Sequence, residues 1–337
     1  MTRVLCLLVG LGWAGAAAPA WSAEPPRLDE VLPLLRRHLT GVSEAEINAA
    51  AVGGLLERLR PRVFLLTNPA PETAEAPPPL LARSNLFEGG LAVVRVGRVA
   101  PGLAPALRAT LEAWHAATNL HGVVLDLRFA DGEDFAAAGE VADLFLTEPQ
   151  PVLEWAGHRF AAAAKTNALP WRLAVLANRE TRGAAEVLAA ALHELRLALV
   201  LGRPTAGEAA EYREFPLSTG QRLRLAVAPV KVGPGGRLLP FEGFPPDIRV
   251  DVPAEDERRY VEDPFYAPPA AATTATATRA PRLTEADLVR IHRDGLGGAA
   301  PRRPRTETPP APRLTDPVLA RALDLLKSLA ILESREP

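Results

Sequence analysis

Side chains that could attack a bond, or accept the proton it releases, are scarce in this chain. Cys6 is the one cysteine, so we expect neither a disulfide framework nor a cysteine-rich metal site. Lysine occurs only at Lys165, Lys231 and Lys327, and no serine stands at a strand-to-helix junction of the expected core. Thr181 is close to such a junction, but we interpret it as the N-cap of the following helix.

Composition excludes several other classes of function. The six histidines show no His-x-His or His-x-x-x-His spacing, so the sequence predicts no metal site and no dissociable cofactor. The 38 basic and 40 acidic residues give a net charge of -2, which leaves no basic surplus for binding nucleic acid. Asp126 and Arg128 end an apolar strand pattern, where we expect them to make structural polar contacts.

The elements that would position a site alternate between the sequence periodicity of strands and that of helices. Apolar runs predict strands at 91–96, 122–127, 173–177 and 198–201, and amphipathic stretches predict helices at 103–117, 135–146 and 184–195. Strands alternating with helices indicate parallel pairing and right-handed crossovers. A hairpin is expected at 212–227, with its turn at Ser218-Thr219-Gly220. The core is therefore predicted to be α/β, over residues 86–253.

The flanking segments have different compositions. Arg3, an apolar run and small residues are typical of a secretory signal peptide over 1–23, with cleavage after Ala20 or Ala23 left open. Residues 24–85 read as a small helical region and a proline-rich linker, and 254–337 as a mostly disordered Pro/Ala-rich tail with a helix at 316–332. We therefore expect export to the periplasm, cell envelope or medium, without a stable membrane span after signal removal.

Three segments in a fixed order carry a family resemblance. They are GVVLDLR at 122–128 followed by Gly132, LAVLAN at 173–178 leading into TRGAAE at 181–186, and LGRPTAG at 201–207. With them the chain resembles the S41 family of serine peptidases, the carboxyl-terminal processing or tail-specific proteases, which have a ClpP/crotonase-like core. The PDZ domain common in that family has no counterpart here, because only about residues 64–86 separate the helical region from the core.

The resemblance also implies which positions would be catalytic. It places the nucleophilic serine at Gly183 and the basic lysine at Glu208, so both groups are missing. Of the paired glycines associated with the oxyanion hole, Gly132 remains and Glu133 replaces the second. We therefore predict that hydrolysis is lost.

These departures favour a non-catalytic pseudopeptidase that binds a peptide or protein through the former active-site cleft; an active relative is one candidate partner. The expected cleft residues are Gly132, Glu133, Arg182, Gly183, Ala184, Glu208 and Tyr212. Two alternatives stay open. An active serine-type peptidase with non-standard residues would need Thr181 and Lys231 within hydrogen-bond reach. A binder of apolar small molecules would need an enclosed apolar pocket.

Glu208 supplies the sharpest structural expectation. By the resemblance it should face Gly183 across the cleft, close to the amino terminus of the helix that follows. A carboxylate in a partly buried site is costly unless it is paired or hydrogen-bonded. We therefore expect an arginine, Arg182 first, within about 4 Å of the Glu208 carboxylate.

Overall fold

The computed structural model describes residues 26–66, 77–266 and 314–333. The chain forms two compact units, Met1–Arg58 and Leu59–Pro337. The expected signal peptide at 1–23 and most of the proline-rich tail lie outside the described residues, so their structure is not addressed.

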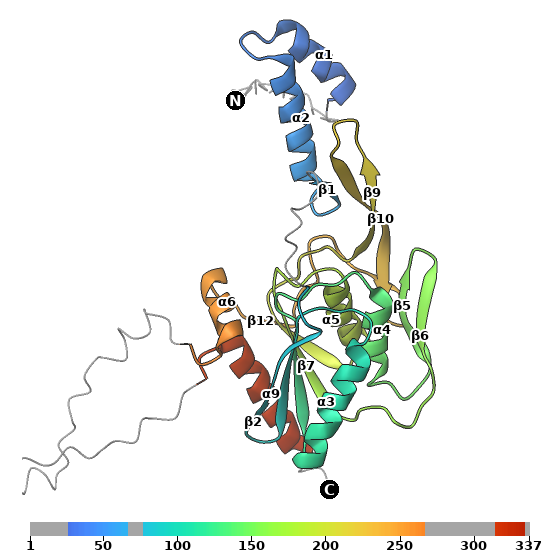
Figure 1. Ribbon diagram of the computed structural model, residues 1–337, viewed down its shortest axis with the longest axis vertical. Coiled ribbons are helices and arrows are strands. Elements are labelled where there is room, and N and C mark those ends of the chain that lie inside the picture. The colour runs from blue at the N-terminus through green and yellow to red at the C-terminus, as the bar shows by residue number, and fades with distance from the viewer. Residues whose placement is uncertain (1–25, 67–76, 267–313, 334–337) are drawn as a thin grey trace, which may run out of the picture. The chain divides into compact units, whose positions relative to one another are not determined.

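The first unit contains a pair of helices, α1 (Leu28–His38) and α2 (Glu44–Arg58), as the apolar periodicity predicts (Figure 1). The amide of Ser43 donates to Glu46 at 2.8 Å, and the amide of Glu46 donates back to the Ser43 hydroxyl at 3.2 Å. This capping box fixes the start of α2. Arg36 connects the helices by an ion pair with Glu44 at 3.3 Å.

A six-stranded sheet forms the centre of the second unit, in the order β12-β8-β7-β4-β3-β2. The strands are β2 (Leu81–Phe87), β3 (Leu91–Val96), β4 (Gly122–Asp126), β7 (Arg172–Ala177), β8 (Ala198–Gly202) and β12 (Ile248–Arg249). All neighbours pair in parallel except β2, which runs antiparallel to β3 at the edge. The predicted α/β class with parallel crossovers is confirmed.

Three helices cover one face of this sheet, namely α3 (Leu103–Ala117), α4 (Phe135–Asp143) and α5 (Ala184–Glu194). Side chains alternate across β4, so Val123 and Leu125 enter this helix-covered core while Val124 points to the opposite face. The residues of α5 from Ala184 to Leu192 are all buried, which holds the amino terminus of the helix rigidly beside the ends of β4 and β7.

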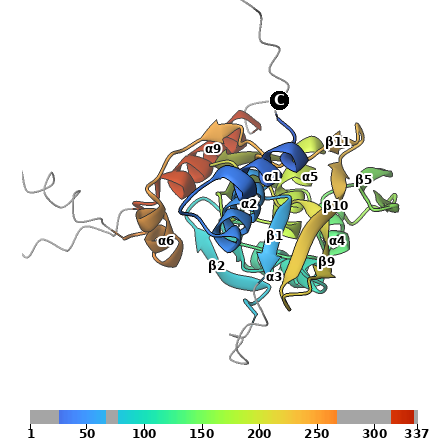
Figure 2. The ribbon, with the colours of Figure 1, turned by 90° about the horizontal axis from the view of Figure 1, so that it is seen from above.

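The opposite face is covered by α6 (Ala254–Glu262) and α9 (Pro317–Glu333), which lie together on one side of the sheet (Figure 2). Leu319, Leu323 and Leu326 of α9 are buried with Val124 and Leu176 of the sheet. The helix expected at 316–332 is therefore present, but it is part of the core. The expectation that the core ends at residue 253 is corrected, because α9 buries its apolar side chains against this face of the sheet.

A second sheet has the order β1-β10-β5-β6, and β9 and β11 also pair with β10. Its strands are β1 (Val63–Leu66), β5 (Gln150–Trp155), β6 (His158–Ala162), β9 (Ala210–Pro216), β10 (Arg222–Val232) and β11 (Arg237–Leu238). The expected hairpin is thus formed by β9 and β10, as a ribbon that leaves the core (Figure 1). Strands β1 and β2 occupy part of the segment expected to be helical region and linker, so the domain boundary lies earlier than residue 85, at Arg58.

Within the three described stretches, no helix has both the length and the apolarity that crossing a bilayer requires.

Candidate functional site

A cleft of about 960 Å³ opens where the loop after β4, the start of α5 and the strand β9 come together. Of the predicted site residues, six line it: Gly132, Glu133, Arg182, Gly183, Glu208 and Tyr212. Ala184 is fully buried behind the lining. The motifs at 122–132, 181–186 and 201–208 thus meet at one cleft because β4, β7 and β8 are adjacent parallel strands whose carboxyl ends share an edge of the sheet.

Gly183 forms the junction between the loop after β7 and α5. It is the N-cap of α5 with φ 57° and ψ -125°, a strained backbone conformation that glycine tolerates and side chains rarely adopt. A Cβ built on Gly183 would fall well inside van der Waals contact of the Gly132 carbonyl oxygen. The junction therefore has the sharp geometry of a nucleophile position but no space for a nucleophile.

The Gly132 carbonyl oxygen also accepts a hydrogen bond from the first amide of α5. The amide of Ala184 donates to Gly132 O at 2.7 Å. Amides at a helix amino terminus are where an acyl-transfer site would stabilise a developing oxyanion. Here a carbonyl of the chain already takes that hydrogen bond, so this donor is not available to a substrate.

Glu208 faces the cleft, as expected, but without the expected cation. No ion pair within 4 Å joins its carboxylate to any basic side chain in the described part of the chain, and Arg182 pairs with Glu180 instead. The expected Arg182–Glu208 pair is wrong, because Glu180 is two residues from Arg182 in the same loop. Burial first, and the charge of Glu208 second, raise the pKa of neighbouring Tyr212 to about 12.

Glu186 holds the loop that carries Glu208. Its buried carboxylate accepts hydrogen bonds from the Thr205 hydroxyl at 2.6 Å, from the Gly207 amide at 3.1 Å and from the Glu208 amide at 2.9 Å. Burial raises the pKa of Glu186 to about 7, against the lowering effect of these hydrogen bonds. Sequence reasoning assigned no role to Glu186; its position among the apolar residues of the first two turns of the helix was the available signal.

Thr181 and Lys231 are each committed to other partners. The buried Thr181 hydroxyl donates to Leu127 O at 2.8 Å and accepts from the Asn178 amide at 3.0 Å, so it ties two strand ends together. The expected N-cap is not Thr181 but Gly183. Lys231 lies on β10, and its Nζ is 3.0 Å from the Glu154 carboxylate. Neither residue lines the cleft.

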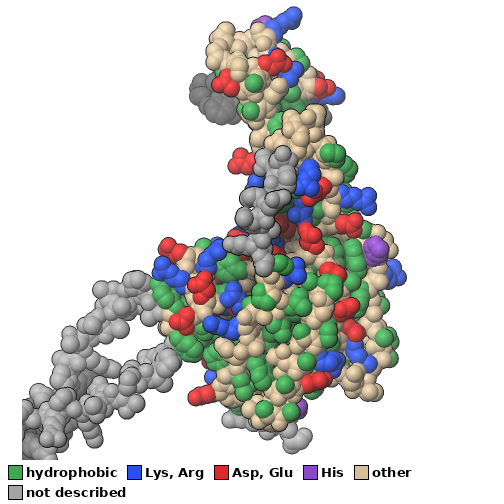
Figure 3. Space-filling view, in the orientation of Figure 1, with side chains coloured by type: hydrophobic (Ala, Val, Ile, Leu, Met, Phe, Trp, Pro, Cys, Tyr) green, Lys and Arg blue, Asp and Glu red, His purple; other side chains and the backbone are tan. Residues whose placement is uncertain are grey.

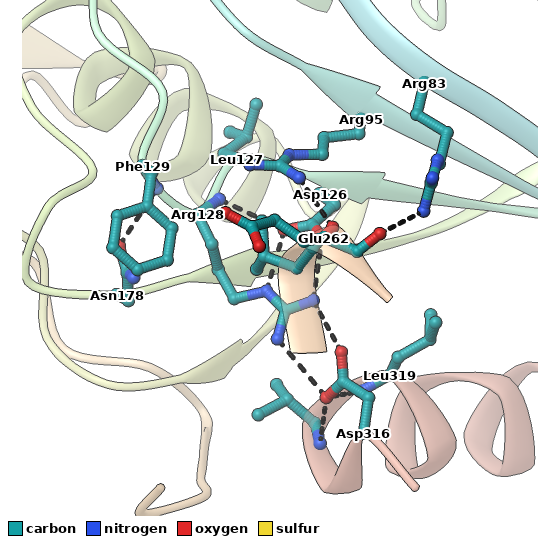
Figure 4. Close-up of polar contacts among 12 residues, drawn as sticks. Arg83, Arg95, Asp126, Leu127, Arg128, Phe129, Asn178, Glu262, Asp316 and Leu319 are labelled. Carbon is teal, nitrogen blue, oxygen red and sulfur yellow. Dashed lines mark hydrogen bonds and ion pairs between the residues drawn. The ribbon is translucent and has the colours of Figure 1, made fainter. Parts of the chain in front are cut away.

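Asp126 and Arg128 have the structural role expected of them. The Arg128 guanidinium binds both oxygens of Asp126, at 2.9 and 2.8 Å, and both oxygens of Asp316, at 3.2 and 2.7 Å. Asp316 also caps α9 by accepting from the amides of Val318 and Leu319 (Figure 4). Burial would lower the pKa of Arg128, but the two carboxylates more than offset it and the net shift is upward. The cluster fastens α9 to the end of β4.

Among the described residues, no three His, Cys, Asp or Glu side chains gather closely enough to hold a metal ion.

Comparison with known proteins agrees with this architecture. The profile of peptidase family S41 matches residues 91–250. The chain is 32% identical over 121 residues to carboxyl-terminal-processing peptidase 2, chloroplastic, of Arabidopsis thaliana, and 33% identical over 134 residues to the chloroplastic C-terminal processing peptidase of Tetradesmus obliquus. These matches cover 33% and 39% of this chain but only 22% and 29% of the two relatives.

Solved structures show the same fold. A crystal structure of a candidate peptidase from Parabacteroides merdae superposes with a TM-score of 0.52 at 16% identity. The match covers 65% of this chain and 79% of that one, which extends the likeness in fold beyond the segment matched in sequence.

Proposed function

Because residues 91–250 make this chain a member of peptidase family S41, we propose that it is a non-catalytic member that binds an extended peptide or protein segment in the cleft. The family resemblance places the nucleophile at Gly183, which has no side chain to attack a bond, and the basic lysine at Glu208, which is a carboxylate. We also propose that the protein is exported, on the signal-peptide pattern of residues 1–23.

The hydrogen bond from the Ala184 amide to the Gly132 carbonyl is the observation that carries this function. It supports the loss of hydrolysis independently of which side chains are present. An enzyme lacking only its serine would keep a free amide for the oxyanion. In this chain the Gly132 carbonyl oxygen accepts the hydrogen bond of the Ala184 amide, and the same oxygen leaves no space for a side chain at Gly183.

Neither alternative gains support from the site. The Thr181 hydroxyl and the Lys231 ammonium are held by Leu127 and Glu154, so each would have to leave its partner before acting. A binder of apolar small molecules needs an enclosed apolar pocket, but this cleft is open and lined by six carboxylates and three guanidinium groups.

The test combines an activity assay with a binding assay. The purified full chain is incubated with a fluorophosphonate probe and with an unfolded protein substrate, beside an active family member as positive control. We expect neither labelling nor cleavage. Photoreactive peptides are then cross-linked to the chain, and we expect mass spectrometry to map the adducts to the cleft, near Glu133 or Tyr212.

Two results would count against the proposed function. Turnover that disappears in Lys231→Met, in a variant shown by circular dichroism to be folded, would establish an active peptidase with a non-standard base. Cross-links confined to surfaces away from the cleft would place binding elsewhere on the protein.

A further inference from the structure

The cleft has an excess of negative charge. Its lining contains the carboxylates of Asp131, Glu133, Asp134, Glu208, Glu211 and Glu214. The basic side chains in the lining are Arg98, Arg182 and Arg224. Acidic and basic groups crowd together where the β9–β10 ribbon leaves the core (Figure 3).

Part of this charge is neutralised by ion pairs. Arg224 binds Glu133 at 3.1 Å, and Arg222 binds Glu214 at 2.7 Å. Glu211 lies 3.7 Å from Arg213, and Arg182 is paired with Glu180 outside the lining. These groups have their counterions within the protein.

Three carboxylates and one guanidinium of the lining have no such partner. Asp131, Asp134 and Glu208 form no ion pair within 4 Å among the described residues. Of the lining arginines, only Arg98 likewise forms no ion pair with a described residue. Asp134 is partly satisfied as the N-cap of α4, and Asp131, whose side chain is partly buried, has a buried Oδ1 without a hydrogen-bond partner. The unpaired lining residues therefore carry about two net negative charges, three carboxylates against one guanidinium.

The shape and polarity of the cleft suit a peptide. Phe135, Trp155 and Tyr212 lie in the lining beside the carboxylates, and aromatic faces attract ammonium and guanidinium groups. Strand β9 contributes Ala210, Glu211, Tyr212 and Glu214 to the lining, and in the described structure it pairs only with β10. Its second edge thus offers main-chain donors and acceptors to an extended chain.

We propose that the ligand of this cleft is an extended peptide segment rich in lysine or arginine, whose cations are received by Asp131 and Glu208. This ligand class rests on the proposed function, since it specifies what a non-catalytic cleft would bind. The described residues provide no basic partner for these two carboxylates, and a cationic ligand would supply one.

Three fluorescein-labelled ten-residue peptides test the charge preference by anisotropy with the full chain. Their sequences alternate alanine with lysine, serine or glutamate, so they share length and spacing and carry positive, neutral or negative side chains at every second position. We expect the lysine peptide to bind at least about tenfold more tightly than the serine peptide, and its affinity to fall as ionic strength rises. The glutamate peptide should not bind.

Charge-neutralising variants test the location. Glu208→Gln and Asp131→Asn should each lower the affinity for the lysine peptide by about fivefold, and the double variant should lower it by roughly 25-fold. Glu140→Gln is the matched control, because this exposed carboxylate on α4 lies outside the lining and its loss changes the net charge equally. Circular dichroism and the urea midpoint verify that every variant is folded.

The possible failures differ in meaning. If the serine and lysine peptides bind equally and cross-link to the cleft, the proposed function stands and the cationic ligand class is overturned. If lysine-peptide binding survives in the double variant, or falls equally in Glu140→Gln, attraction is nonspecific and the assigned site is wrong. If no peptide binds at any charge, the proposed peptide-binding function itself fails.

Discussion

Substitution of Asp316 should destabilise the whole second unit, although this residue lies in the segment 254–337 that the sequence placed outside the core. The Asp316 side chain is fully buried, and it joins the Arg128 guanidinium to the first amides of α9 (Figure 4). Asp316→Ala removes both interactions, whereas Asp316→Asn removes the charge and keeps an oxygen that can cap the helix.

The magnitude follows from the geometry of the cluster. Removing one partner of a buried ion pair costs about 3–5 kcal/mol. Because Arg128 keeps both contacts with Asp126, the lower end of that range applies to Asp316→Ala, and loss of the helix cap adds about 1 kcal/mol. We therefore expect Asp316→Ala to lose about 4 kcal/mol of unfolding free energy, and Asp316→Asn about 2 kcal/mol, since the asparagine NH2 group cannot accept one of the two hydrogen bonds from Arg128.

Urea unfolding, followed by circular dichroism and tryptophan fluorescence, measures these losses. Asp324→Ala is the matched control, because Asp324 is an exposed carboxylate on the same helix and should change stability by less than about 0.5 kcal/mol. A double-mutant cycle with Arg128→Met isolates the coupling between Arg128 and Asp316 from the loss of the cap.

A result of less than about 0.5 kcal/mol for Asp316→Ala would mean that α9 is not coupled to the sheet, and would refute this reasoning. The stronger perturbation is truncation after Asp263, which strips α9 from the sheet face containing Val124 and Leu176. We expect that chain to be insoluble or to lose cooperative unfolding, and a soluble, cooperative product would contradict the packing of α9.

Three further predictions concern the cleft and the buried residues that support its loops. Gly183→Ser should remain unlabelled by a fluorophosphonate and should lower the urea midpoint, because its Cβ meets the Gly132 carbonyl oxygen. Thr181→Val should cost about 1–3 kcal/mol of unfolding free energy, because the amide of Asn178 and the carbonyl of Leu127 lose a buried partner. Burial raises the pKa of Glu186 from 4.5 to about 7 on folding, so its stabilising contribution is complete below pH 4.5 and lost as pH rises through 7. Unfolding free energy should accordingly fall by up to about 3 kcal/mol between pH 5 and 8, and Glu186→Gln should flatten that dependence in urea titrations.

The central sheet could be predicted because its strands and helices have distinct periods. β3, α3 and β7 begin and end where the apolar pattern changes. The packing of α9 was missed, although the sequence contained a signal for it. Strands such as β4 are apolar on both faces, and the helices between 91 and 250 cover one face, so a later amphipathic helix was needed for the other.

The composition of the site was more predictable than its hydrogen bonding. Parallel strand order brought Gly132, Gly183 and Glu208 to one cleft, as the motifs indicated. Which way the Gly132 peptide faces depends on the loop backbone, and residue types do not encode it directly. The Arg182–Glu208 pair failed for a related reason, since a nearer carboxylate at Glu180 competes for the same guanidinium and sequence gives no distances.

The loss of hydrolysis and the preference for cations would share one physical cause. An acyl-transfer site concentrates positive potential where negative charge develops, through helix amides and a cationic base. In this cleft the Ala184 amide is satisfied by the Gly132 carbonyl, and Glu208 stands where the resemblance places the lysine, so both changes make the same position more negative. Under the proposed function, turnover would require a nucleophile, a base and a reoriented Gly132 peptide together. Receiving an ammonium or guanidinium group requires none of these changes, which is why we favour binding over turnover.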